Sequence, residues 1–153
     1  MQRRSILQSM AAAALTSLNL PLVAKPAPTM VEVWKDPSCG CCKDWIAHVQ
    51  SSGFAVKVHD TGNTAARARL GLPQKLGSCH TALVGGYVVE GHVPARDVLR
   101  LLQERPGALG LAVPGMPVGS PGMDGPAYGG RKDAYDVLLV QADGSNTIYQ
   151  TYR

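Results

Sequence analysis

Three cysteines stand within four residues of one another in the string Cys39-Gly40-Cys41-Cys42, and a fourth follows at Cys79. The string lies between residues 30–35, which alternate apolar and polar side chains as a strand does, and residues 42–50, which have helical periodicity. A helix N-terminus favours the thiolate form of a nearby cysteine, and a thiolate is both the nucleophile of disulfide exchange and a ligand for soft metals. The string therefore favours a fold that carries a reactive sulfur site between a strand and a helix.

The rest of the pattern predicts a thioredoxin-like α/β fold, with a mixed four-stranded sheet and helices on both faces. A strand-helix-strand unit is parallel and a tight hairpin is antiparallel, so the order β-α-β-α-β-β-α gives this arrangement. The elements expected after the first helix are a strand over 54–59, a helix over 64–70, a hairpin of strands 81–84 and 87–90, a helix from Pro94 to about Arg105, a Gly/Pro-rich loop without regular structure over 109–132, and a final hairpin of 134–140 and 147–151.

The first 24 residues have the parts of an export signal, with a basic start at Arg3 and Arg4, an apolar run and small residues at its end. The run is too short and too often interrupted to span a membrane. The arginine pair also resembles a twin-arginine signal, with the general secretory route as the alternative. We expect a signal peptide over 1–24, a leader over 25–29 and one domain over 30–152, in the periplasm and with no membrane span after cleavage.

The net charge argues against nucleic-acid partners. The chain has 15 basic and 11 acidic residues, a formal charge of +4, and loss of Arg3 and Arg4 leaves 13 basic residues and a charge of +2. A charge this small, spread over both signs, does not form the basic face that nucleic acid or an anionic membrane surface requires.

The second cysteine string, Ser78-Cys79-His80-Thr81, precedes the third expected strand. Thioredoxins carry a cis-proline there, beside the active cysteines, so Cys79 is expected close to the first string. Disulfide exchange needs two cysteines, whereas a soft-metal site uses all four. Thiolates select Cu(I) or zinc, and a tetrahedral zinc site of Cys39, Cys42, Cys79 and His80 would leave Cys41 over. Cu(I) binds two or three sulfurs and shares them between ions, so the crowded cysteines favour copper, in a polynuclear site, over zinc.

Other side chains are candidates for the same site. His80 is either a ligand or a hydrogen-bond donor to one, and His92 fits a helix start as well as it fits a site. Met116 and Met123 bring soft thioether sulfurs on the Gly/Pro-rich loop, where they serve either as copper ligands or as apolar anchors. His48, offset from the apolar stripe of its helix, is expected at the surface.

The strings Val31-Glu-Val-Trp-Lys-Asp-Pro-Ser-Cys-Gly-Cys-Cys42, Ser78-Cys-His-Thr81 and Gly91-His-Val-Pro94 follow an export signal. Together they resemble the CopG-type periplasmic copper-resistance proteins, over roughly residues 30–152. The resemblance implies a thioredoxin-like core and a copper site built on Cys39, Cys41, Cys42 and Cys79. It also implies a role in handling Cu(I) and Cu(II), and leaves open whether the protein stores, passes on or oxidises copper.

Two other functions fit the cysteines. A thiol–disulfide oxidoreductase would use Cys39 and Cys42, although the extra cysteines and the missing cis-proline argue against it. A structural role would pair Cys39 with Cys42 and Cys41 with Cys79 in an oxidising compartment. Whether the protein is an enzyme, a copper or a thiol oxidoreductase, is therefore open at the level of sequence. On the copper interpretation, the partners are copper ions and a periplasmic copper chaperone or efflux system.

Overall fold

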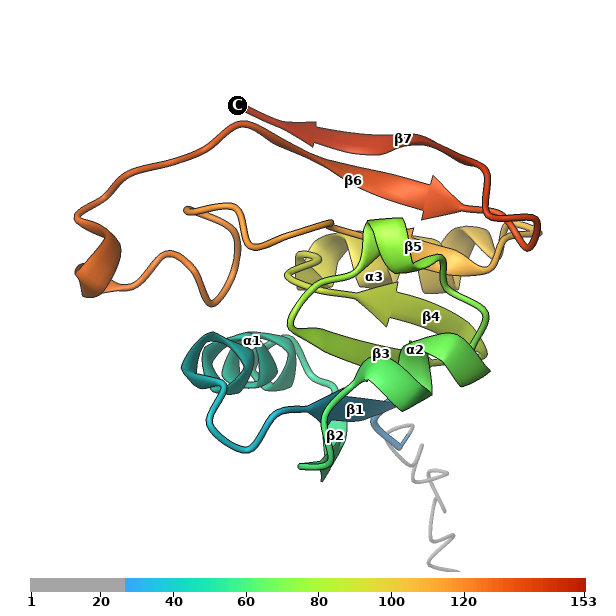
Figure 1. Cartoon of the computed structure of the whole chain (residues 1–153), viewed down its shortest axis with the longest axis horizontal. Helices are drawn as coiled ribbons and strands as arrows, with labels where there is room; N and C mark the ends of the chain where they lie inside the picture. Colours follow the sequence, from blue (N-terminus) through green and yellow to red (C-terminus); the bar gives the residue numbers. More distant parts are fainter. Residues whose placement is uncertain (1–26) are drawn as a thin grey trace, which may run out of the picture.

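The structure, a computed structural model, describes residues 27–153; the predicted signal peptide and the first two residues of the predicted leader lie outside them. Seven strands form one mixed, open sheet in the order β2-β1-β3-β4-β5-β6-β7 (Figure 1). The strands are β1 Met30–Lys35, β2 Ala55–His59, β3 His80–Val84, β4 Tyr87–Glu90, β5 Gly110–Ala112, β6 Tyr135–Val140 and β7 Asn146–Tyr152. The helices are α1 Gly40–Ser51, α2 Thr64–Arg69 and α3 Ala95–Glu104, with 3-10 turns at Gln74–Leu76 and Pro126–Tyr128.

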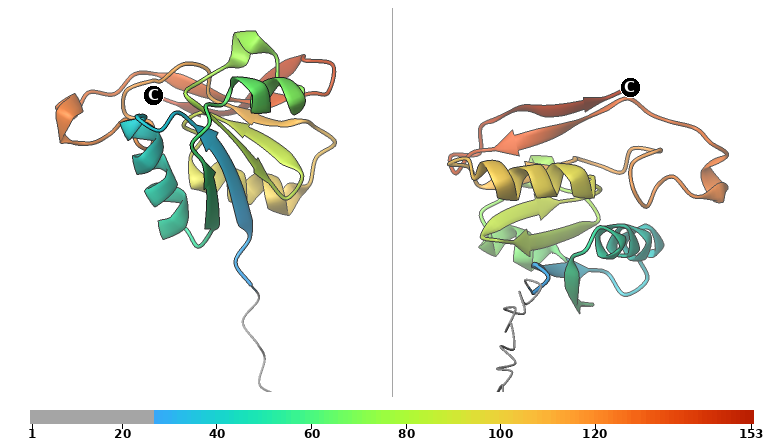
Figure 2. Two further views of the ribbon diagram at one scale, coloured as in Figure 1. Left: turned by 60° about the horizontal axis from the view of Figure 1, so that its bottom comes forward. Right: turned by 180° about the vertical axis from the view of Figure 1, so that it is seen from behind.

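The order of the first four strands and three helices agrees with the prediction. β1 and β2 are parallel and joined by α1, and β3 is antiparallel to both β1 and β4. Gly85 and Gly86 connect β3 to β4 with φ angles of 55° and 90°, a region that glycine occupies without a steric penalty. As expected, the helices cover both faces of the sheet, with α1 and α3 on one face and α2 on the other (Figure 2).

The segment predicted as a loop from residue 109 contains a strand, so the prediction is wrong at β5. β5 is parallel to β4 and antiparallel to β6, so the β6–β7 hairpin extends the same sheet. A three-residue strand that begins with glycine is too short to show a period-two pattern. Glycine is required at 110 because a Cβ there would collide with the Val88 carbonyl oxygen across the strand pair. The turn at Pro126–Tyr128 is a second short element inside the predicted loop.

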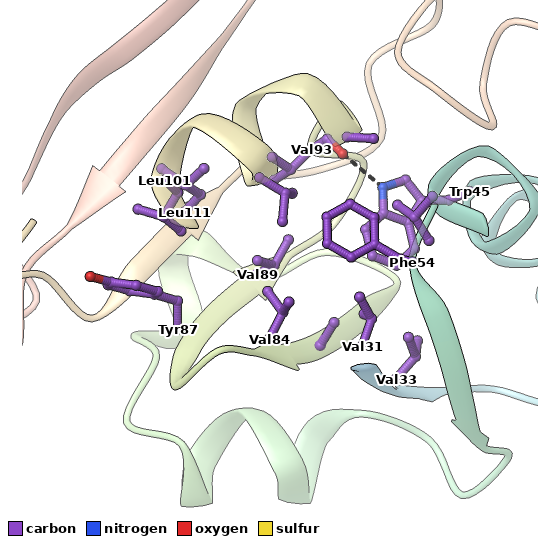
Figure 3. Packing of buried hydrophobic residues seen from close by; sticks show 14 of the residues in the cluster. Val31, Val33, Trp45, Phe54, Val84, Tyr87, Val89, Val93, Leu101 and Leu111 are labelled. Carbon is purple, nitrogen blue, oxygen red and sulfur yellow. Dashed lines mark hydrogen bonds between the residues drawn. The ribbon is translucent and has the colours of Figure 1, made fainter. Parts of the chain in front are cut away.

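The main core lies between the sheet and helices α1 and α3 (Figure 3). Trp45 from α1 and Leu101 from α3 are almost fully buried against sheet residues such as Val33 and Val89. The Trp45 indole N–H also donates a hydrogen bond to the Val93 carbonyl oxygen, at 2.8 Å. Burial of an aliphatic side chain such as that of Leu101 stabilises the fold by roughly 1.5–3 kcal/mol. Trp45 thereby holds the start of α1 on the sheet, one turn away from the first cysteine string.

A smaller cluster lies apart from this core and contains Leu72, Leu76 and Val140. It packs the segment after α2 onto the sheet and so supports the chain that leads to the second cysteine string. None of the helices within residues 27–153 has the length and hydropathy that crossing a membrane requires.

Candidate metal centre

The first cysteine string forms the start of α1. The helix begins at Gly40, two residues earlier than the periodicity indicates, with Cys39 at its N-cap. Cys39 and Cys42 form a disulfide, whereas Cys41 is a free thiol. Cys42 is fully buried and Cys39 is half-buried, so Cys39 is the sulfur of the disulfide that solvent reaches.

The second string meets the first because β3 pairs with β1. Their antiparallel register places His80 opposite Lys35, so Cys79 lies where β1 turns toward α1. The Sγ atoms of Cys79 and Cys41 are 3.8 Å apart, and those of Cys41 and Cys39 are 3.6 Å apart. All four cysteine sulfurs lie within 4.8 Å of one another. The predicted convergence of the two strings is confirmed.

Two histidines stand beside Cys79. The Nε2 atom of His92 is 3.1 Å from Cys79 Sγ, and the Nδ1 atom of His80 is 3.4 Å from it. The His92 Nδ1–H donates to the Pro121 carbonyl oxygen at 2.8 Å, which leaves a lone pair on Nε2 that faces the sulfur. Cys79, His80 and His92 thus form a second group of ligand atoms, also within 4.8 Å of one another.

Burial sets the protonation of this group. It raises the pKa of the Cys79 thiol to about 12, and the neighbouring Cys41 adds to the rise. It lowers the pKa of His80 to about 3, with a smaller effect from His92, and it also lowers the pKa of His92. At neutral pH Cys79 is therefore a protonated thiol beside two neutral imidazoles, and a metal that binds Cys79 must displace its proton. The Nε2 atom of His80 is buried and has no hydrogen-bond partner among residues 27–153.

The segment predicted as a Gly/Pro-rich loop over 109–132 contacts the first cysteine string and His92. Gly122 has a φ of 87°, and a Cβ there would lie 2.6 Å from the Cys41 carbonyl oxygen. Its neighbour Pro121 accepts the hydrogen bond from His92. The two loop methionines differ. Met123 is buried, with its sulfur accepting a hydrogen bond from the Tyr128 hydroxyl at 3.2 Å, whereas Met116 is half exposed.

A buried ion pair supports the Cys79 segment. Arg67 and Glu90 pair at 2.8 Å, and the Glu90 carboxylate also accepts hydrogen bonds from Ser78 N at 2.7 Å and from the Thr81 hydroxyl at 2.6 Å. Arg67 donates in addition to the Ser78 carbonyl oxygen, at 2.6 Å. Burial raises the pKa of Glu90, and these hydrogen bonds act in the opposite direction. The backbone on both sides of Ser78 is thus held by charged side chains.

Sequence patterns alone did not assign His92 or this ion pair to the site. The Gly91-His92-Val93-Pro94 string, between a strand and a helix, is the signal that points to His92. Arg67 and Glu90 carry no local signal, because they lie 23 residues apart and meet only when α2 packs on the sheet.

His48 is less exposed than its predicted surface position suggests. His48 is half-buried, and its Nε2 accepts a hydrogen bond from Ala95 N at the start of α3, at 3.0 Å. The periodicity of α1 describes contacts with the sheet, whereas His48 faces the neighbouring helix.

We expect His48 to make the protein less stable in mild acid. Burial lowers the pKa of His48, and the carboxylate of Asp124 opposes the shift more weakly. The unfolded chain, whose histidine pKa is about 6.5, then binds a proton that the folded chain does not. The stability that the neutral, buried His48 gives the folded protein is therefore complete above the unfolded-state pKa, and it is lost as the pH falls below that value. Thermal midpoints measured from neutral pH to about pH 5 should decline less steeply in His48→Gln, and equal slopes would contradict the assignment.

Comparison with known proteins places the chain among copper-resistance proteins. Two solved structures, described as copper resistance protein CopG in form 1 and form 2, are 48% and 47% identical to this chain, with TM-scores of 0.75 and 0.76. Each match covers 82% of this chain, and 98% and 99% of the respective CopG chain. Residues 76–123 match a family described as a protein of unknown function, DUF411, and no curated protein matches. Identity at this level over nearly the whole length of the relatives shows that the chain belongs to the CopG copper-resistance protein family.

Proposed function

We propose that the protein binds Cu(I) in the periplasm through Cys39, Cys41, Cys42 and Cys79, and exchanges it with a periplasmic chaperone or an efflux system during copper stress. The observation that carries this proposal is the convergence of four cysteine sulfurs, from two segments of the chain, to within 4.8 Å. Thiolate sulfur is the donor that selects Cu(I), and sulfurs this close are suited to bridging more than one ion. Relatives described as copper resistance proteins support the same assignment.

Nitrogen donors extend the proposal to copper redox chemistry. Imidazole suits Cu(II) as well as Cu(I), and His80 and His92 present neutral rings to Cys79. A site with thiolates on one side and imidazoles on the other therefore has donors for both oxidation states. We infer that copper is the cargo of this site and that His80 and His92 act as ligands beside the cysteines.

The first test is an anaerobic titration of the reduced protein with Cu(I), in competition with a chromophoric chelator. We expect more than one tightly held Cu(I) per chain, and a lower stoichiometry in both Cys39→Ser and Cys79→Ser, because a hydroxyl is a poor ligand for a soft ion. Ser38→Ala, next to Cys39 but without a change of sulfur, is the matched control and should bind as the parent does. Weak binding by the parent would overturn the copper assignment.

The Cys39–Cys42 disulfide supports a second candidate function, thiol–disulfide exchange. In the reduced protein the accessible Cys39 thiolate would attack a substrate disulfide, and Cys42 would then displace the substrate thiolate from the mixed disulfide, which re-forms the Cys39–Cys42 bond. On this function Cys39→Ser abolishes the reduction of a disulfide substrate while Cys79→Ser retains it. On the copper function both variants lose copper, so the same pair of variants separates the two.

A further inference from the structure

The chain that follows β5 is tied directly to the second cysteine string. Gly115 N donates to the Gly77 carbonyl oxygen at 3.2 Å, and the Ser78 hydroxyl donates to the Gly115 carbonyl oxygen. These two hydrogen bonds hold Gly115 beside the residues that precede Cys79. Met116, the next residue, is therefore kept near Cys79 by backbone contacts, and its side chain remains 52% exposed.

Met116 lines two depressions in the surface. One has a volume of about 360 Å³ and is lined by Cys79, Met116 and the residues around Ser78 and Arg67. The other, of about 590 Å³, is bordered by Met116, by Asp133 and by other residues before and within β6. Among the residues that line the two depressions, Met116 alone belongs to both.

We propose that Met116 is the capture ligand of the site, which takes Cu(I) at the surface and passes it to Cys79. The proposal rests on the copper function proposed above. A thioether is a soft donor that carries no proton to displace, so it forms a bond to Cu(I) without prior ionisation. In the transfer step the bond from Cu(I) to Met116 Sδ breaks as the bond to Cys79 Sγ forms. The thiol proton of Cys79 leaves to water, and copper stays in the +1 state throughout.

The assignment separates Met116 from Met123. Met123 is 8% exposed, and its sulfur already accepts the hydrogen bond from Tyr128. Met116 lines a depression together with Cys79 and is open to solvent. Of the two methionines that the sequence offers as loop ligands, Met116 has the position that incoming copper reaches first.

The test measures the rate of copper uptake. The reduced protein is mixed anaerobically in a stopped-flow instrument with Cu(I) held by bicinchoninate, and the loss of the chelator complex is followed by absorbance. We expect Met116→Leu to slow uptake by about tenfold, which corresponds to ~1.4 kcal/mol in the barrier. The final amplitude, which reports copper held by the cysteines, should match the parent. Met30→Leu is the matched control, since Met30 is equally exposed at 52% but stands at the start of β1.

Each other outcome overturns the proposal in a distinguishable way. Uptake by Met116→Leu at the parent rate removes Met116 from the route and leaves the cysteine site intact. A loss of final amplitude in Met116→Leu makes Met116 a permanent ligand rather than a capture ligand. Failure of the parent to take up Cu(I) overturns the copper function and the capture ligand together.

Discussion

The oxidised protein should hold less Cu(I) than the reduced protein. The disulfide between Cys39 and Cys42 takes two of the four sulfurs out of the donor set, because a sulfur in a disulfide is not a thiolate. Cys41 and Cys79 remain as thiols, 3.8 Å apart. Anaerobic Cu(I) titration of the two redox forms, each assayed for free thiols beforehand, measures the difference directly. We expect the number of Cu(I) ions bound per chain in the oxidised form to fall to the number that the Cys41 and Cys79 thiols alone can hold.

A double variant, Cys39→Ser with Cys42→Ser, provides the control for this experiment. It cannot form the disulfide, so its copper capacity should equal that of the oxidised parent and should not change on treatment with a dithiol. If the oxidised and reduced parent proteins bound the same number of Cu(I) ions, copper binding would not depend on Cys39 and Cys42. The site would then consist of Cys41, Cys79 and the histidines.

Glu90→Gln should cost much of the stability of the fold. Glu90 is fully buried, and the substitution removes its charge while leaving that of Arg67 in place. Removing one partner of a buried ion pair typically costs about 3–5 kcal/mol. The measurement is equilibrium unfolding in denaturant. Because Glu90 also binds Ser78 N, we expect the variant to hold Cu(I) less tightly even under conditions where it is folded.

The exposed pair of Arg100 and Glu104 offers a matched control on the same protein. Its charged groups are 2.8 Å apart but 44–45% exposed, and an exposed pair contributes little to stability because water screens its charges. Glu104→Gln should therefore change the free energy of unfolding far less than Glu90→Gln. A double variant, Arg67→Met with Glu90→Leu, should be less destabilised than Glu90→Gln, since no uncompensated charge is left inside. Similar costs for Glu90→Gln and Glu104→Gln would contradict the role given to the buried pair.

Local sequence patterns predicted the parts of the fold that local patterns control. The alternation in residues 30–35, the Gly85-Gly86 turn and the helical spacing after Cys42 each depend on neighbours in the chain. Their order was enough to bring the two cysteine strings together. β5 was not predicted because a strand of three residues that begins with Gly110 is too short to show the alternation of apolar and polar side chains. Its pairing depends on β4 and β6, which lie on either side of it in space.

The same distinction holds for the side chains in and around the candidate site. The cysteines could be predicted because four sulfurs in two short strings stand out in the sequence, whereas the contacts of His48 and Arg67 could not be predicted. His48 accepts a hydrogen bond from Ala95 N, 47 residues away, and Arg67 of α2 pairs with Glu90 of β4, 23 residues away. Such contacts follow from the packing of whole elements, which periodicity within one element does not describe. The difference between Met116 and Met123 likewise arises from the path of the loop, since both lie in the same kind of Gly/Pro sequence.

The pairing of β5 with β6 also bears on how proteins of this architecture can diverge. The long loop leaves and re-enters the sheet on adjacent strands, with Ala112 opposite Leu138, so the sheet itself holds the two ends of the loop together. Doubling the length of a loop closed in this way costs only about 0.6 kcal/mol in chain entropy. Insertions between the two strands therefore cost little in chain entropy, provided that they leave the contacts of Gly115, Pro121 and Gly122 with the cysteine strings and His92 in place. Donor atoms above the cysteines can be exchanged, added or lost in this segment while the scaffold that carries the cysteines stays the same.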